Sequence, residues 1–188
     1  MKYYYFVVWF LLVLIGCRSD KKQASFTIAF GSCNNQLLKN NLWDVIETKQ
    51  ADVWIWGGDV IYSDTHDMEF LRSNYKMLSE HPSYAKIKNN IEIIGVWDDH
   101  DYGMNDGGVT YEMKADSQKA FLDFLEVDKI DPRRKREGIY TSSTYTSGDL
   151  SIKILLLDTR YFRTDLTKDS LTSKRYRPND YGQGTLLG

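Results

Sequence analysis

The sequence predicts one α/β domain in which strands and helices alternate, on three observations. Apolar runs of strand length recur along the chain and are separated by segments whose apolar residues have helical spacing. Three of these runs each end in a loop rich in polar side chains, which is typical of layered α/β proteins. The length of 188 residues, with 42% hydrophobic and 27% charged residues, suits a globular domain with its own core.

Four apolar runs are expected to be strands. They cover residues 26–30, 52–56, 91–97 and 150–157. Each has the length of a buried strand and is followed by glycine, asparagine or aspartate, which favour turns.

Three segments are expected to be helices, at residues 41–49, 67–80 and 112–126. The second should end before Pro82, because proline disfavours helical geometry at the residue that precedes it. Each helix lies between two predicted strands or follows the third, as the α/β pattern requires.

The N-terminal segment predicts a targeting signal. Lys2 precedes an apolar run at residues 6–15 that is too short to span a bilayer as a structural helix. The run ends in Leu-Ile-Gly-Cys17, which resembles a bacterial lipobox. We expect residues 1–16 to be a lipoprotein signal peptide, Cys17 to carry lipid and residues 17–25 to be a tether; the alternative is a generic signal peptide with a chance cysteine. The protein would then be anchored to a membrane of the bacterial cell envelope, facing the periplasm or the outer surface.

Charge and cysteine content narrow the possibilities further. The formal net charge of −2 gives no support to a nucleic-acid partner, and we expect a monomer. The chain has two cysteines, Cys17 and Cys33. If Cys17 carries lipid, Cys33 has no disulfide partner within the chain, so it is either a buried inert thiol or a metal ligand.

Polar clusters follow three of the predicted strands. Cys33 follows the first strand, Asp59 and Tyr62 follow the second, and the third leads into an acidic stretch at residues 98–106. Ligands of α/β sheets bind at the carboxyl ends of the strands, so these loops are expected to converge on one site. The acidic stretch holds four carboxylates close to one another, an arrangement that is costly unless cations or hydrogen-bond donors neutralise them.

The side-chain types in these loops suit two cations. Asp59 lies in a glycine-flanked turn, where one carboxylate can bridge two metal ions. A thiolate from Cys33 and a tyrosinate from Tyr62 are strongly donating anions that suit trivalent iron.

Several of these residues also have a structural interpretation. Cys33 could be a core thiol and Tyr62 a core ring, Asp64 could cap a turn or support a ligand from behind, and Asp158 could form a structural ion pair with Arg160. Two histidines, His66 and His81, are expected on the surface. The basic run at residues 133–136 is either a solvated loop or a receptor for an anionic substrate or lipid head group.

Four motifs occur in an order that resembles the PhoD-like alkaline phosphatase D family of metallophosphoesterases. They are residues 30–33 (Phe-Gly-Ser-Cys), 58–64 (Gly-Asp-Val-Ile-Tyr-Ser-Asp), 97–105 (beginning Trp-Asp-Asp-His-Asp) and 157–163 (Leu-Asp-Thr-Arg-Tyr-Phe-Arg). The resemblance covers residues 26–188. It implies an α/β/β/α sandwich and hydrolysis of phosphomonoesters or phosphodiesters at a mixed Fe(III) and Ca(II) centre.

The resemblance also implies roles for individual residues. Cys33 and Tyr62 would hold iron, and Asp59 would bridge the two metals. The second, calcium-type site would use Asp98 or Asp99, with the choice between them open, together with Asn105.

The same resemblance implies the residues that act on substrate. His100 would protonate the leaving oxygen or stabilise charge in the transition state. Arg160 would contact phosphate, for which a planar guanidinium is well shaped, and Arg163 would lie beside it.

The family's pattern continues beyond the motifs present here, with a late Gly-Asp-x-His motif that residues 1–188 do not contain. The resemblance therefore implies a C-terminally truncated catalytic domain, an incomplete metal centre and an exposed apolar face. The alternative function is a catalytically inert surface lipoprotein that binds phosphate or another partner. A calcium-dependent nuclease is a third possibility, which the net charge does not support.

Overall fold

The chain forms a mixed α/β structure around a three-stranded parallel sheet. The computed structural model describes residues 24–39, 42–179 and 184–187. The sheet contains β1 (Ile28–Gly31), β2 (Val53–Gly57) and β3 (Glu92–Val96) in the order β1-β2-β3. The α/β class and these three predicted strands are confirmed, with ends that differ from the expected ends by one or two residues.

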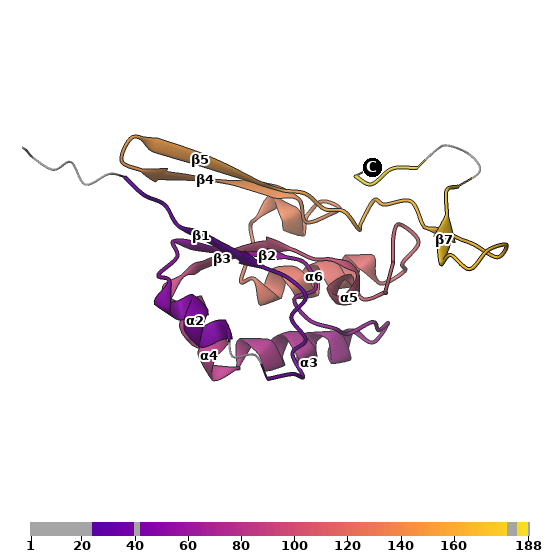
Figure 1. The fold of residues 1–188 in the computed structure, drawn as a ribbon, viewed down its shortest axis with the longest axis horizontal. Coiled ribbons are helices and arrows are strands. Elements are labelled where there is room, and N and C mark those ends of the chain that lie inside the picture. The colour runs from indigo at the N-terminus through magenta and orange to yellow at the C-terminus, as the bar shows by residue number, and fades with distance from the viewer. Residues whose placement is uncertain (1–23, 40–41, 180–183, 188) are drawn as a thin grey trace, which may run out of the picture.

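Helices connect the parallel strands and cover one face of the sheet (Figure 1). Helix α2 (Leu42–Thr48) links β1 to β2, whereas α3 (Met68–Ser79) and α4 (Pro82–Asn90) link β2 to β3. Helix α4 was not predicted, because Pro82 indicated only the end of the preceding helix. The structure places Pro82 in the first turn of α4, where proline is well tolerated because that amide has no partner within the helix.

Two further helices follow the sheet along the chain. The short α5 (Asp99–Tyr102) lies within the acidic stretch, which was expected to be a loop. Helix α6 (Lys114–Phe124) occupies the centre of the predicted segment 112–126 and packs against α3. A 3-10 turn, η1 (Pro132–Arg134), then leads away from α6.

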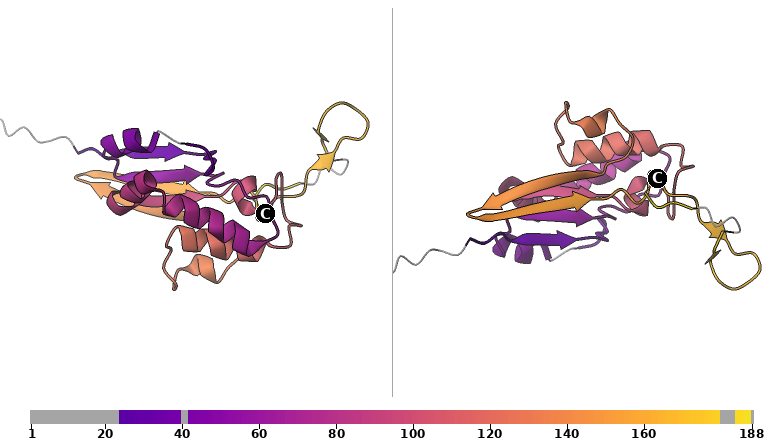
Figure 2. Two further views of the ribbon diagram at one scale, coloured as in Figure 1. Left: turned by 90° about the horizontal axis from the view of Figure 1, so that it is seen from below. Right: turned by 90° about the horizontal axis from the view of Figure 1, so that it is seen from above.

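A hairpin lies on the other side of the sheet from α2, α3 and α4 (Figures 1 and 2). It consists of β4 (Thr141–Ser147) and β5 (Leu150–Leu156), which pair antiparallel. Strand β5 was predicted, but β4 was not, because its sequence is Thr-Ser-Ser-Thr-Tyr-Thr-Ser and lacks an apolar run. The Tyr145 hydroxyl donates to Glu92 at 3.1 Å, and the Tyr145 ring packs on Phe26, which ties the hairpin to the sheet.

The last described segment forms a small ribbon at one end of the molecule (Figure 2). Strands β6 (Thr167–Lys168) and β7 (Tyr176–Arg177) pair antiparallel and are joined by a loop. The sequence offered no signal for strands of two residues. The ribbon extends from the edge of the sheet at which the carboxyl ends of β1, β2 and β3 lie.

The core between the sheet and the helices is strongly aromatic. Trp43, Trp54, Trp56 and Tyr84 are buried and pack with their rings in edge-on or tilted contact. The indole of Trp56 also donates a hydrogen bond to the Tyr84 hydroxyl at 3.0 Å. This aromatic layer holds β2 against α2 and α4, and so fixes the positions of the loops that follow the strands.

Gly95 permits the close approach of β3 to β2, and we expect Gly95→Ala to destabilise the fold. A Cβ atom there would lie 2.5 Å from the Trp56 Cβ and 2.9 Å from the Trp56 carbonyl oxygen. Relief would require backbone movement, so the free energy of unfolding should fall by about 1–3 kcal/mol in denaturant titrations. Gly57→Ala is the matched control, because its nearest atom would lie at 3.6 Å; equal losses in the two variants would contradict the explanation.

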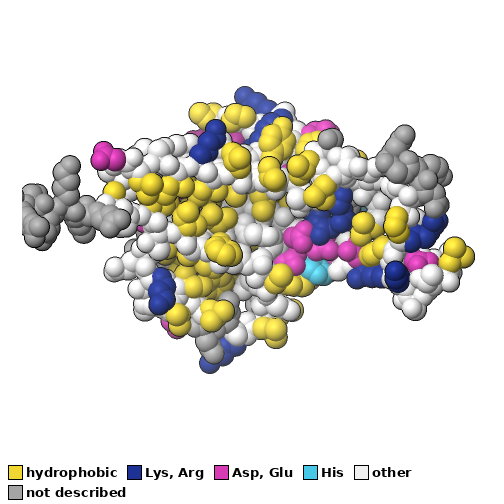
Figure 3. All heavy atoms as spheres, turned by 45° about the horizontal axis from the view of Figure 1, so that its top comes forward, with side chains coloured by type: hydrophobic (Ala, Val, Ile, Leu, Met, Phe, Trp, Pro, Cys, Tyr) yellow, Lys and Arg dark blue, Asp and Glu magenta, His cyan; other side chains and the backbone are white. Residues whose placement is uncertain are grey.

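Apolar side chains gather on the face formed by the hairpin and β1 (Figure 3). Phe30 is 81% exposed and Leu155 is 65% exposed. A groove of about 860 Å³ also lies between β1 and α2. The hairpin and β1 therefore expose apolar side chains on this face, and Phe30 lies in the same motif as Cys33, at residues 30–33.

The predicted lipoprotein signal at residues 1–16 and the lipidation site Cys17 lie outside the described residues, as does most of the tether. Within the described part of the chain, no helix has the length and apolar character needed to cross a bilayer. The anchoring of the protein therefore stays a prediction.

Candidate functional site

The loops that follow β1, β2 and β3 meet at one edge of the sheet. Backbone hydrogen bonds join the first two loops, from the Cys33 amide to the Gly58 carbonyl at 3.2 Å and from the Asn34 amide to the Asp59 carbonyl at 2.8 Å. The second and third loops touch at Gly58, where an added Cβ would lie 2.5 Å from that of Asp98. The predicted convergence of the three polar loops is confirmed.

Two amide side chains brace these loops and were missed in the sequence. Gln36 donates to the Tyr62 carbonyl at 3.0 Å and accepts from the Tyr62 amide at 2.8 Å. The Asn34 side chain donates to the Val60 carbonyl at 3.0 Å. The only available signal was their position, directly after the first motif, where amide side chains can satisfy backbone groups in turns.

Asp59 is the central residue of the site. It is buried, and its carboxylate accepts from the Cys33 thiol at 3.5 Å and from the Tyr62 hydroxyl at 3.4 Å. Its other oxygen accepts from the His100 amide at 3.4 Å. Asp59 has a φ of 51°, a left-handed conformation that aspartate tolerates better than most residues. Cys33 is exposed, so the core-thiol alternative is wrong.

Three side chains offer ligand atoms to a common point. Asp59, Asp99 and His100 each present one oxygen or nitrogen, and these atoms lie within 4.8 Å of one another. Asp98 instead pairs with Arg160, with 2.5 Å between Oδ1 and Nε. The geometry therefore places Asp99, and not Asp98, with Asp59 and His100.

The carboxylates in this cluster have opposite electrostatic environments. Burial raises the pKa of Asp59, and the neighbouring charges of Asp98 and Asp99 raise it further. Burial acts on Asp99 in the same direction, but the Asp106 amide, Arg160 and His100 outweigh it and lower the pKa of Asp99. An ionised Asp59 is thus disfavoured unless a positive charge lies beside it.

The phenol of Tyr62 is also held in its neutral form. Burial raises the pKa of Tyr62, and the proximity of Asp59 and Cys33 raises it again. Its ring packs on the His100 ring with 4.2 Å between centroids. Tyr62 is partly exposed and contacts Asp59, so it is not a simple core ring.

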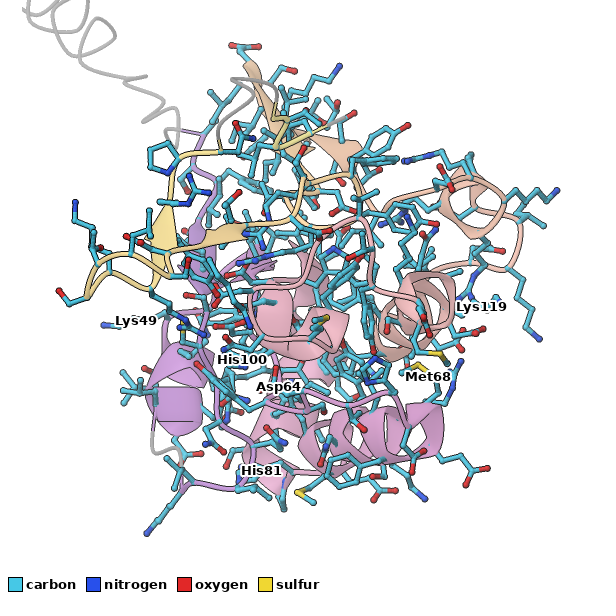
Figure 4. All side chains as sticks on the ribbon, turned by 90° about the vertical axis from the view of Figure 1, so that its right-hand side faces the viewer. Lys49, Asp64, Met68, His81, His100 and Lys119 are labelled. Atoms are coloured by element: carbon cyan, nitrogen blue, oxygen red, sulfur yellow. The ribbon has the colours of Figure 1, made fainter. Side chains whose placement is uncertain are left out.

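Asp64 orients the imidazole of His100. The Asp64 carboxylate lies 2.6 Å from His100 Nδ1, and Figure 4 shows the two side chains beside each other. Nε2 of His100 lies 3.4 Å from the Asn105 amide nitrogen. The other two histidines, His66 and His81, are exposed, as expected.

Asp101 has a structural role that the sequence could not separate from those of its neighbours. It is completely buried and accepts hydrogen bonds from the amides of Asp59, Val60 and Asp98. Burial raises the pKa of Asp101, although these amides act in the opposite direction. One carboxylate therefore ties the loop after β2 to the loop after β3.

Asp158 is a second buried carboxylate that organises backbone. It accepts from the Trp97 indole at 3.0 Å and from the amides of Ile139, Arg160 and Tyr161. The Arg160 guanidinium pairs with Asp98 and not with Asp158, so the alternative of a structural Asp158–Arg160 ion pair is wrong.

Arg160 and Arg163, the two arginines predicted to bind substrate, both form hydrogen bonds within the protein. The buried Nη1 of Arg160 has no hydrogen-bond partner among the described residues, whereas its Nε binds Asp98. Arg163 donates to the carbonyls of Asp106 and Gly107 and so braces the loop that carries Asn105. In Figure 3, Lys or Arg side chains lie next to a group of acidic side chains and a histidine.

Three arginines of the basic run at residues 133–136 contact other side chains of the protein. Arg133 pairs with Asp131 and Arg134 with Asp123, at 2.9 and 2.7 Å. The guanidinium of Arg136 stacks over the Tyr140 ring at 3.6 Å. These contacts favour a structural role for the run over reception of an anionic ligand.

No family model, curated protein or solved structure matches the chain. The functional assignment therefore depends on the side chains of the site. Their defining feature is one carboxylate, Asp59, that contacts a thiol and a phenol and lies with a second carboxylate and an imidazole.

Proposed function

We propose that the chain carries the metal site of a phosphoesterase that hydrolyses phosphate mono- or diesters, of the PhoD-like metallophosphoesterase type with its α/β/β/α sandwich. The single observation that carries the proposal is the position of Asp59 between two donor sets. Cys33 and Tyr62 contact its carboxylate, and Asp99 and His100 lie with it within 4.8 Å. A shared carboxylate is the feature that a two-cation site requires.

The donor chemistry suits two different cations. A thiol and a phenol beside Asp59 suit Fe(III), because both become strongly donating anions when deprotonated. The oxygen ligands of Asp99 and Asn105 suit a harder cation such as Ca(II). Bound cations would supply Lewis acidity for the phosphoryl group and the attacking water, and their charge would offset the high pKa of Asp59.

The remaining side chains have tasks that follow from their contacts. The Asp64 carboxylate lies 2.6 Å from Nδ1 of His100 and fixes the orientation of the ring, so Nε2 faces the site and could pass a proton to the leaving oxygen of the substrate. The Arg160 guanidinium is fixed by Asp98 and lies 3.8 Å from Asp99, where it could contact a phosphate oxygen at the cluster. The same Nε2 of His100 could instead hold a cation, and Asp64 would then orient a metal ligand.

Metal content and hydrolysis together test the proposal. We expect the purified chain to retain iron and to bind calcium. Hydrolysis of p-nitrophenyl phosphate or its bis ester that is lost after chelation would show that this metal site also supports turnover. A folded chain that binds neither metal would overturn the proposal. Metal binding without turnover would favour the alternative function, a catalytically inert lipoprotein that binds phosphate. The membrane anchor of the protein is proposed on the sequence alone.

Tyr62→Phe tests the ferric assignment independently of turnover. A phenolate bound to Fe(III) absorbs visible light, so the iron-loaded chain should be purple or violet and should lose most of this absorbance in Tyr62→Phe. Tyrosinate without iron is colourless, so the colour itself reports the bond between Tyr62 and Fe(III). Tyr140→Phe is the control, because this tyrosine packs on Arg136 away from Asp59. Retained colour in Tyr62→Phe at equal iron content would contradict the assignment.

A further inference from the structure

The β6–β7 ribbon (residues 167–177) contacts the acidic loop of the candidate site. The Arg175 guanidinium lies 2.7 Å from the Asn105 side-chain oxygen and 2.7 Å from an Asp106 carboxylate oxygen. The Tyr176 hydroxyl donates to the same Asp106 carboxylate at 2.6 Å. Two successive residues of the ribbon therefore dock on two successive residues of the acidic loop.

The docking residues themselves contact the central cluster. The Asn105 side-chain nitrogen lies 3.4 Å from Nε2 of His100, and the Asp106 amide donates to Asp99 at 2.7 Å. A single carboxamide thus separates the Arg175 guanidinium from the His100 ring. One phosphate group has the size to contact a guanidinium and an imidazole across such a gap.

Arg175 differs from the other arginines near the site in how exposed its side chain is. The Arg160 side chain is 11% exposed and is held by Asp98, and Arg163 is partly buried and held by backbone carbonyls. The Arg175 side chain is 70% exposed, and its neutral partner, the Asn105 carboxamide, can be exchanged at little cost. A charged phosphate oxygen is a stronger acceptor for a guanidinium than a neutral amide oxygen.

We infer that Arg175 is a recognition residue for the phosphoryl group and that it favours dianionic phosphate monoesters over monoanionic diesters. The inference rests on the proposed function and deepens it, by naming the substrate class. On binding, the guanidinium exchanges the Asn105 oxygen for a phosphate oxygen while Asp106 keeps it near the site.

Binding of inorganic phosphate to the iron- and calcium-loaded full chain tests the inference without turnover. In isothermal titration calorimetry, Arg175→Gln should weaken phosphate affinity about 10-fold or more, because a charge-assisted hydrogen bond is lost. Arg175→Lys should give an intermediate loss, because the charge remains without the planar fork. Where turnover is measurable, Arg175→Gln should lower kcat/KM for p-nitrophenyl phosphate more than for the bis ester.

Lys174→Gln is the matched control, since it removes a neighbouring exposed charge from the same ribbon. It should change phosphate affinity by less than about threefold, as expected for an exposed, screened charge. Equal phosphate affinity in Arg175→Gln and the unmodified chain would overturn the inference alone, as would equal losses in Arg175→Gln and Lys174→Gln. An unmodified chain that binds no metal would overturn the phosphoesterase proposal, and this inference with it.

Discussion

Asp59→Asn should reduce metal affinity by a factor on the order of 100 or more and abolish any hydrolysis. Asp59 contacts Cys33 and Tyr62 and also lies within ligand distance of Asp99 and His100, a combination that no other carboxylate in the described part of the chain has. Residues that merely support a ligand cost about 10- to 100-fold in affinity when they are mutated, so a bridging ligand should cost at least as much. Metal content after dialysis, measured by elemental analysis, gives the result directly.

The same variant should fold at least as well as the unmodified chain when metals are absent. Burial and two neighbouring carboxylates raise the pKa of Asp59, so the fold disfavours its ionised form. Asparagine removes this charge, and it also tolerates the left-handed φ of 51°. A variant that loses metal while keeping or gaining thermal stability has the signature of a residue retained for function.

Asp149→Asn is a matched control, because it makes the same chemical change in the exposed turn of the β4–β5 hairpin. It should alter neither metal content nor stability. Full metal retention by Asp59→Asn would contradict the central role of Asp59. A large loss of stability in that variant would instead show that Asp59 supports the fold.

The sequence predicted the parts of the fold that have strong local signals. Strands β1, β2 and β3 are apolar runs between turn residues, and each was placed within two residues of its observed bounds. Strand β4 was missed because its residues are polar, and its partly buried face is defined only by pairing with β5. Helix α4 was missed because a proline can both end one helix and begin the next.

The sequence also located the loops of the site, but it could not predict which partner each aspartate in them has. Asp98, Asp99 and Asp101 are close in sequence, yet the structure gives them three different partners. Asp98 pairs with Arg160, Asp99 lies with Asp59 and His100, and Asp101 accepts three backbone amides. The direction of each side chain depends on the short helix α5, which no periodicity in four residues can indicate.

Contacts between distant segments were beyond prediction for a different reason. Arg175 lies 70 residues from Asn105, and neither belongs to a periodic segment. Their contact depends on the path of the chain after β5 and on the two-residue pairings of the β6–β7 ribbon. The basic run at residues 133–136 was conspicuous in the sequence as a candidate anion receptor. In the structure, Arg133 and Arg134 instead form local ion pairs.

Asp101→Ala should be among the most destabilising single changes in the chain, although Asp101 directly follows His100, a candidate ligand. The variant would leave the amides of Asp59, Val60 and Asp98 without their acceptor in a fully buried position. Each unsatisfied buried donor costs about 1–3 kcal/mol, so we expect a loss of about 3 kcal/mol or more in the free energy of unfolding. For a chain of this size, that corresponds to a fall in Tm of about 10 °C.

Asp101→Asn distinguishes the contribution of the hydrogen bonds to stability from that of the negative charge. Its remaining oxygen can still accept from Asp59 and Asp98, whereas its amide nitrogen would face the Val60 amide, so the loss should be smaller than in Asp101→Ala. Asp149→Ala, in the exposed turn, should change the free energy of unfolding by less than about 0.5 kcal/mol. If Asp101→Ala melted like the unmodified chain but lost its metal, Asp101 would be a ligand and not the tie between the loops. Because Asp101 holds Asp59 and Asp98 through their backbone, its loss should disorder both sides of the site together, and no added metal should restore the geometry.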